Sequence, residues 1–150
     1  IEDLSAKGQG DYVTFPRPMA DEKNYDFSFS GLKTSMINYI KKYGVTEDNL
    51  SNIMASFQEA AFDVLVSKTT RAALDHGIPR IVVGGGVASN GRLRQVFTER
   101  CKKGGMEALF SSPEFCTDNG AMIARVAYQY YSEGATSSLN VAGYSRMKIR

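Results

Sequence analysis

The stretch that decides the fold is RIVVGGGVASN at residues 80–90, in which a short β-branched run enters three glycines. Such a run is typical of a buried strand in a parallel sheet. A helical pattern of apolar residues follows from Asn90 or Gly91 to Gly104, and residues 106–110 form a second short apolar run. A strand, a helix and a second strand of these lengths predict a right-handed parallel crossover, and hence an α/β fold.

Three further helices are predicted around this unit. Apolar residues recur with helical spacing over residues 31–43, 46–76 and about 117–130, and the second of these patterns corresponds to a helix roughly 40 Å long. Phe27 and Phe29 alternate with serines, which indicates a short strand. Two interpretations of this segment stay open: its phenylalanines enter the core, or its polar residues line a cleft. Because an average sheet has about five or six strands, we expect the rest of this sheet to come from elsewhere or from edges in the N-terminal segment.

The chain divides into three regions by composition. Residues 1–25 form a lead-in rich in glycine and proline, residues 26–131 carry the α/β core, and residues 132–150 form a polar tail. With 150 residues, 43% hydrophobic and 23% charged, the chain fits one globular domain. No stretch approaches the roughly 18 apolar residues of a membrane span, so no membrane partner is expected. A formal net charge of +2 is too small to predict a nucleic-acid partner by itself.

The scarce residue types restrict the possible chemistry. Cys101 and Cys116 cannot form a disulfide framework, and the chain shows no apolar N-terminal leader, so we expect a reducing compartment and no export. His76 is the only histidine, so a site with two or three imidazoles cannot be built from this chain alone. Because the sequence begins at Ile1 rather than Met, we expect it to be part of something longer.

The glycine turn at residues 84–86 is the first candidate site. Glycines between a strand and a helix let the backbone approach a ligand closely, and the helix N-terminus favours a phosphate. The turn is not a dinucleotide-binding fingerprint, because Ser89 stands where the third glycine belongs, and it is not a Walker loop, because Arg92 replaces the lysine. Nucleotide or phosphate binding and a plain tight turn both remain open. The basic face of residues 92–103 indicates a solvated surface or, beside a nucleotide site, contacts to RNA phosphates.

The segment CTDNG at residues 116–120 is the second candidate site. Asp118 is interpreted either as an N-cap of the last helix or as a ligand at the lip of a cleft. Because loops at the carboxyl ends of parallel strands lie on the same side of a sheet, we expect this segment and the glycine turn to face one crevice. In a third segment, residues 26–34, Ser30 is a candidate helix cap, and the roles of Ser30 and Lys33 stay undecided.

Four strings of this sequence together resemble one known family. They are FPRPM at 15–19, DFSFSGLKT at 26–34, IVVGGGVASNGRLR at 81–94 and PEFCTDNGAMIA at 113–124. In order and spacing all four are similar to the TsaD family of tRNA N6-adenosine threonylcarbamoyltransferases, formerly called O-sialoglycoprotein endopeptidases or glycoproteases. The sequence CTDN at residues 116–119 resembles the bacterial type of this family.

The resemblance implies an actin-like ATPase fold (ASKHA, ribonuclease H-like), of which this chain would be a partial second lobe with long helices, the carboxy-terminal part of the protein. It implies an acyltransferase that moves a threonylcarbamoyl group from threonylcarbamoyl-adenylate to the N6 amine of the adenosine next to the anticodon. Its implied partners are tRNA, a non-catalytic paralogue and an ATPase subunit, in the cytoplasm.

The resemblance also assigns roles to individual residues. Gly84, Gly85 and Gly86 would bring the backbone against ATP or threonylcarbamoyl-adenylate, and Asn90 would bind substrate. Asp118 would complete a site for one divalent metal, Fe²⁺ or alternatively Zn²⁺. The other metal ligands implied are two histidines of an HxxxH motif in the N-terminal half, which this sequence lacks, so we expect the chain alone to be inactive. No catalytic residue is assigned.

Two other functions fit this sequence less well than the transferase. A metal-dependent glycoprotein endopeptidase would need a metal-polarised water and a general base, and the sequence supplies neither. A non-catalytic interaction module with the actin-like fold would not need Asp118 and Asn90 at the positions that match the family. Both alternatives therefore rank behind the transferase.

Overall fold

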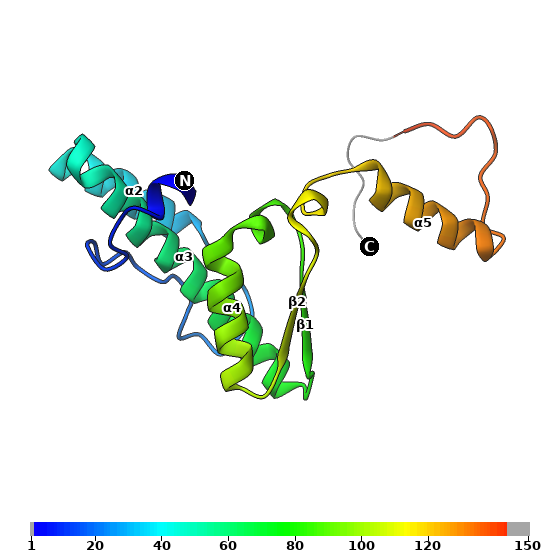
Figure 1. Ribbon diagram of the computed structural model, residues 1–150, viewed down its shortest axis with the longest axis horizontal. Helices are drawn as coiled ribbons and strands as arrows, with labels where there is room; N and C mark the ends of the chain where they lie inside the picture. Colours follow the sequence, from blue (N-terminus) through cyan, green and yellow to red (C-terminus); the bar gives the residue numbers. More distant parts are fainter. Residues whose placement is uncertain (1, 144–150) are drawn as a thin grey trace.

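The computed structural model describes residues 2–143 (Figure 1). The elements are α1 (Glu2–Ser5), α2 (Ser30–Tyr43), α3 (Glu47–Asp75), β1 (Arg80–Val83), the 3₁₀ helix η1 (Gly86–Ser89), α4 (Gly91–Lys103), β2 (Glu107–Phe110), the 3₁₀ helix η2 (Pro113–Phe115) and α5 (Gly120–Ser132). The four predicted helices and the two predicted strands of the central unit are confirmed in type and order. The short helices α1, η1 and η2 were not predicted.

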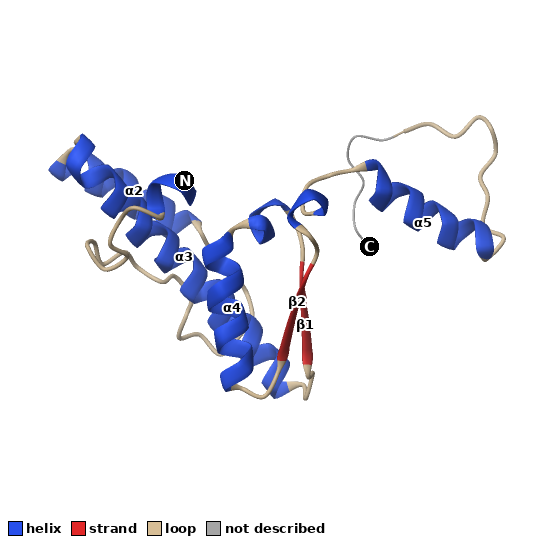
Figure 2. Ribbon diagram, in the orientation of Figure 1, coloured by secondary structure: helices blue, strands red, loops and turns tan. Residues whose placement is uncertain are grey.

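The two strands form a small parallel sheet, as the crossover pattern predicts. Arg80 pairs with Glu107 and Val83 with Phe110, and α4 makes the connection between the strands (Figure 2). Side chains on one face of the sheet, such as Ile81, pack against α3 and α4. On the other face Val82 is 77% exposed, because no described element covers it.

The long helix α3 joins two hydrophobic clusters. Its C-terminal half packs with α4 and β1 around buried residues: Phe62, Val66, Ala73, Ile81, Leu93, Phe97 and Cys101. Its N-terminal half packs with α2 and the lead-in around Phe15, Leu32, Ile53 and Ala60. Phe15, which is only 1% exposed, contacts the rings of Tyr39 and Phe57 edge-on. The loop-rich lead-in therefore belongs to the core although it contains little regular structure.

The prediction of a strand around Phe27 and Phe29 is wrong. Residues 25–29 have no regular structure, and the two phenylalanine rings stack on each other 6.5 Å apart while 44% and 42% exposed. No described strand lies beside them to form a ladder, so this backbone is held from α3 instead, by the ammonium of Lys68. Ser30 is the first residue of α2 and not its cap, and its hydroxyl lies 3.1 Å from that of Ser28.

Helix α5 projects away from the rest of the molecule (Figure 1). It has no buried residue, and apolar side chains such as Ile123 and Val126 are 71% and 52% exposed. Within residues 2–143 no helix is both long and apolar enough to cross a membrane. The candidate site lies at the carboxyl ends of the two strands, and α5 reaches it only with Met122 of its first turn.

Candidate functional site

The glycine turn, which follows β1, has a backbone conformation that favours glycine. Gly85 has φ +92°, a region that residues with a side chain rarely adopt. A Cβ atom added to Gly84 or Gly85 would meet nothing within 4 Å, so the outer surface of the turn is open. Within residues 2–143, the backbone N–H groups of Gly85 and Gly86 donate no hydrogen bond. The turn therefore presents free donors to a ligand, as an anion-binding loop requires.

The loop after β2 carries Asp118 on its surface. The side chain that caps α5 is Asn119, whose Oδ1 accepts a hydrogen bond from the Met122 N–H at 3.0 Å and whose Nδ2 donates to the Thr117 carbonyl at 2.9 Å. Asp118 is exposed, and within the described residues its carboxylate takes part in no hydrogen bond or ion pair. The N-cap interpretation of Asp118 is thus wrong, and its carboxylate is free for a ligand.

The two loops share one cavity, as the parallel arrangement predicts. Its volume is about 540 Å³. The residues that line it are Gly84, Gly85, Gly86, Ser111, Phe115, Cys116, Thr117, Asp118 and Met122. A Cβ on Gly86 would lie 3.9 Å from the Thr117 methyl group, so the turn and the Asp118 loop are direct neighbours. The structure therefore brings four of the five predicted site residues together.

Asn90 lies apart from this cavity. It caps α4 by accepting from the Leu93 N–H at 2.9 Å, and its Nδ2 donates to Oε1 of Gln58 at 3.0 Å. Only 8% of Asn90 is exposed, on a smaller hollow of about 260 Å³ that it shares with Gln58 and Gly86. Gly86 lines both hollows, so the glycine turn separates Asn90 from Asp118. The second amide hydrogen of Asn90 makes no hydrogen bond within the described residues.

A metal ion at Asp118 would need further ligands. Within residues 2–143 no group of three or more histidine, cysteine, aspartate or glutamate side chains could hold a metal. An unpaired, exposed carboxylate suits a ligand of iron or zinc, but one such group is only part of the three or four that these ions take. His76 lies at the C-terminal end of α3 against the ring of Tyr25, at the other end of the sheet.

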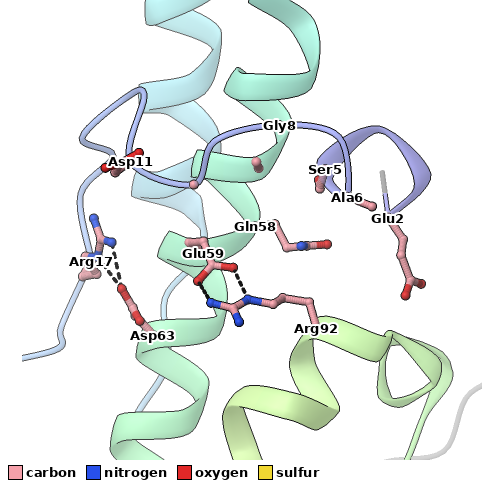
Figure 3. Close-up of a pocket in the computed structure, with 12 residues that line it drawn as sticks. Glu2, Ser5, Ala6, Gly8, Asp11, Arg17, Gln58, Glu59, Asp63 and Arg92 are labelled. Carbon is pink, nitrogen blue, oxygen red and sulfur yellow. Dashed lines mark hydrogen bonds and ion pairs between the residues drawn. The ribbon is translucent and has the colours of Figure 1, made fainter.

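A further hollow of about 590 Å³ lies between the lead-in, α3 and α4 (Figure 3). Arg17 pairs with Asp63 there, and Arg92 donates to both carboxylate oxygens of Glu59 at 2.7 and 2.9 Å. The hydrogen bonds that Arg92 donates to Glu59 raise the pKa of Arg92. These charges neutralise each other, and none of the five predicted site residues lines this hollow. We interpret it as a packing feature.

Sequence reasoning missed Arg94. The interpretation of residues 92–103 as a solvated basic face is wrong at Arg94, which is half-buried and donates to the Ala88 and Ser111 carbonyls, whereas Arg92 is exposed and pairs with Glu59. Both arginines lie in the first turns of α4, where no acidic residue is present and the helix dipole disfavours a cation. A cation at such an unfavourable position indicates that its side chain has a specific partner, and this is the feature of the sequence that points to Arg94.

These features are typical of α/β proteins with a candidate binding cavity at the carboxyl ends of parallel strands. The TsaD family, described as tRNA N6-adenosine threonylcarbamoyltransferase, matches residues 1–125. The chain belongs to this family.

Curated relatives carry the same description. The tRNA N6-adenosine threonylcarbamoyltransferase of Clostridium beijerinckii is 43% identical over 99% of this chain and 44% of its own length. That of Syntrophus aciditrophicus is 42% identical with the same coverage, and that of Thermotoga neapolitana is 44% identical over 89% of this chain and 40% of its own length. The chain thus spans less than half the length of these relatives.

Proposed function

We propose that this chain supplies the nucleotide-binding turn and one metal ligand of a tRNA N6-adenosine threonylcarbamoyltransferase. One observation carries the proposal: Gly84, Gly85, Gly86 and Asp118, in the loops that follow the parallel strands β1 and β2, line one cavity. The family membership of residues 1–125 supports the same activity. The wider architecture would be the actin-like ATPase fold, with residues 1–25 as lead-in, 26–131 as the α/β part of the chain and 132–150 as tail, where the lead-in contributes Phe15 to the packing and α5 contributes no buried residue.

The reaction would transfer threonylcarbamoyl from its adenylate to the N6 amine of adenosine beside the anticodon. Attack of the amine on the mixed anhydride forms the new C–N bond and releases AMP. This chemistry requires an anchored phosphate, a polarised carbonyl and a positioned amine. The free N–H groups of Gly85 and Gly86 would hold the adenylate, and Asn90 would contact it from the other side of the turn. A metal bound at Asp118, Fe²⁺ or Zn²⁺, would supply a Lewis acid.

The remaining parts of the proposal concern what lies outside this chain. The substrate would be tRNA, and ATP or threonylcarbamoyl-adenylate would be the nucleotide ligand. A non-catalytic paralogue and an ATPase subunit would be its partner proteins, in the cytoplasm. Further metal ligands would be histidines outside the residues given, so we expect the chain alone to be inactive.

A chimera tests the proposal. In it, this chain replaces the matching segment of the Clostridium beijerinckii relative, and mass spectrometry of tRNA nucleosides measures threonylcarbamoylation. We expect the chimera to modify tRNA and the chain alone to modify none. In the chimera, Asp118→Ala should lower the metal bound per chain to less than about a tenth, whereas Glu114→Ala, which removes a carboxylate of the same loop outside the cavity, should not.

Two results would contradict the proposal. One is a chimera that unfolds cooperatively at the temperature of the parent relative and yet leaves tRNA unmodified, which would favour a non-catalytic interaction module. The other is an unchanged metal content in Asp118→Ala, measured by elemental analysis. Cleavage of a glycoprotein by the chimera would favour the endopeptidase instead.

A further inference from the structure

The side chain of Arg94 reaches both loops of the candidate site. From α4, its Nε donates to the Ala88 carbonyl at 2.7 Å, and one terminal nitrogen donates to the Ser111 carbonyl at 2.6 Å. The same nitrogen lies 3.3 Å from Sγ of Cys116. The guanidinium also lies over the ring of Phe110, 5.0 Å from its centroid. One half-buried side chain thus bridges two segments that are separated in the sequence.

The contacts of Arg94 connect the segment that follows the glycine turn with the loop that carries Asp118. Ala88 belongs to η1, which begins at the last glycine of the turn. Ser111 and Cys116 begin and end the loop that leads to Asp118, and both line the cavity. Within residues 2–143 no carboxylate lies within ion-pair distance of Arg94. Its charge is therefore directed to backbone oxygens and to sulfur, and not to an acidic partner.

These loops need a connection of their own. The ladder between β1 and β2 ends where Val83 pairs with Phe110, so residues 84–86 and 111–118 extend beyond the sheet without ladder hydrogen bonds. A guanidinium has donors on different edges of one rigid plane, so it can hold two loops at a set separation. A lysine, with a single ammonium on a flexible chain, cannot hold both in the same way.

We propose that Arg94 is a positioning residue that sets the separation between the glycine turn and the Asp118 loop. It acts through the Ala88 and Ser111 carbonyls and does not line the cavity itself. The connection between the loops follows from these contacts alone. Its consequence for nucleotide and metal binding rests on the proposed function.

The thiol of Cys116 reports on this connection without any assumption about function. Cys116 is 3% exposed and its sulfur contacts Arg94 and Ser111, so opening of the loop must expose it. We compare Arg94→Met with the matched variant Arg92→Met, which removes the neighbouring ion pair with Glu59, by alkylating the purified full chain with iodoacetamide. Mass spectrometry of proteolytic peptides separates Cys116 from Cys101. Cys101 is 1% exposed, and burial raises the pKa of its thiol, so it serves as the internal reference.

In Arg94→Met we expect alkylation of Cys116 to become at least about tenfold faster, because hydrogen bonds to a charged group stabilise the closed loop. Cys101 should keep its rate, Arg92→Met should leave both rates unchanged, and Arg94→Lys should give an intermediate rate for Cys116. Equal Cys116 rates in the Arg94→Met and Arg92→Met variants would overturn the proposal. A parallel acceleration of Cys101 would also overturn it, because the effect would then be global unfolding.

The chimera described above tests the consequence for binding. Arg94→Met should weaken the affinity for AMP and for Zn²⁺ together, each by about tenfold or more, and Arg94→Lys should restore part of both. If AMP and Zn²⁺ bind the unmodified chimera and Arg94→Met changes neither affinity, the positioning role is overturned. If the unmodified chimera binds neither, the proposed function fails, while the Cys116 measurement still decides the connection between the loops.

Discussion

Lys68 is a buried cation whose partners are oxygen atoms of one loop. Only 1% of its surface is exposed, and its ammonium donates to the Asn24 carbonyl, the Asn24 side chain and the Asp26 carbonyl at 3.3, 3.0 and 2.7 Å. Arg71 adds hydrogen bonds to the Glu22 and Asn24 carbonyls at 2.7 and 2.6 Å. Burial of an ammonium is tolerated only when such dipoles replace its hydration. The two cations hold residues 22–26 on α3 in place of a strand ladder.

Substitution of Lys68 tests this role at the scale of one residue. We expect Lys68→Met to lower the free energy of unfolding by about 2 kcal/mol, because three hydrogen bonds to a charged donor are lost. Lys41→Met, which alters an exposed lysine in the last turn of α2, should change it by less than about 0.5 kcal/mol. Urea denaturation followed by circular dichroism measures both. Equal midpoints for the two variants would show that the loop does not depend on Lys68.

Asparagine caps begin both helices that follow the strands, but the two helices depend on them differently. Asn90 caps α4 and also binds Gln58 in the interior, so it connects α4 to α3. Asn119 caps α5, a helix of 13 residues without a buried side chain. An isolated helix of that length is marginal in water, so its own cap contributes a large share of its stability. The same residue type therefore has a global effect in one element and a local effect in the other.

Amide hydrogen exchange distinguishes the two effects. Asn119→Ala should destabilise α5 by about 1 kcal/mol and accelerate exchange over residues 120–132 only, leaving the global unfolding temperature unchanged. Asn119→Asp, which keeps a capping oxygen, should behave like the unmodified chain. Asn90→Ala should instead lower global stability by about 2 kcal/mol. Unchanged exchange in α5 after Asn119→Ala would mean that α5 is held by contacts other than its cap.

At the scale of the whole molecule, one side of the sheet is uncovered and α5 stands apart from the core. Val82 and Leu109 are paired across the uncovered face and are 77% and 40% exposed. Ile123 and Val126 of α5 add further exposed apolar surface. Apolar patches of this kind mark surfaces that contact other protein. The chain spans less than half the length of its curated relatives, which is consistent with such a surface.

We therefore expect the purified chain to self-associate as its concentration rises. Replacing Val82 by Thr and Ile123 by Gln together should reduce this association while changing the free energy of unfolding by less than about 0.5 kcal/mol, since both side chains are exposed. Ile81→Thr, on the covered face, should cost about 2 kcal/mol or more. Analytical ultracentrifugation and urea denaturation measure these quantities. A chain that stays monomeric at every concentration would contradict the expectation.

Some features could be predicted because they depend on neighbours in the sequence. The β-branched run at residues 80–83 predicts its strand, and the helical spacing over residues 46–76 predicts α3, whose start the structure shows as a capping box of Thr46 and Asn49. The common cavity of the glycine turn and Asp118 also follows from the sequence, because the carboxyl ends of parallel strands must lie on one side. Phe27 and Phe29 could not be placed, because alternation has the same appearance whether or not a partner strand is present.

The sequence by itself determined the order of helices and strands, the parallel crossover and the resemblance to the family, since spacing and local conformational preference are properties of the chain. Only the tertiary structure decided that Asn119 and not Asp118 caps α5, that Asn90 faces Gln58, and that Arg94 bridges two loops. These outcomes depend on which polar groups come within about 3 Å of one another after packing. Periodicity carries no information on such encounters between distant segments.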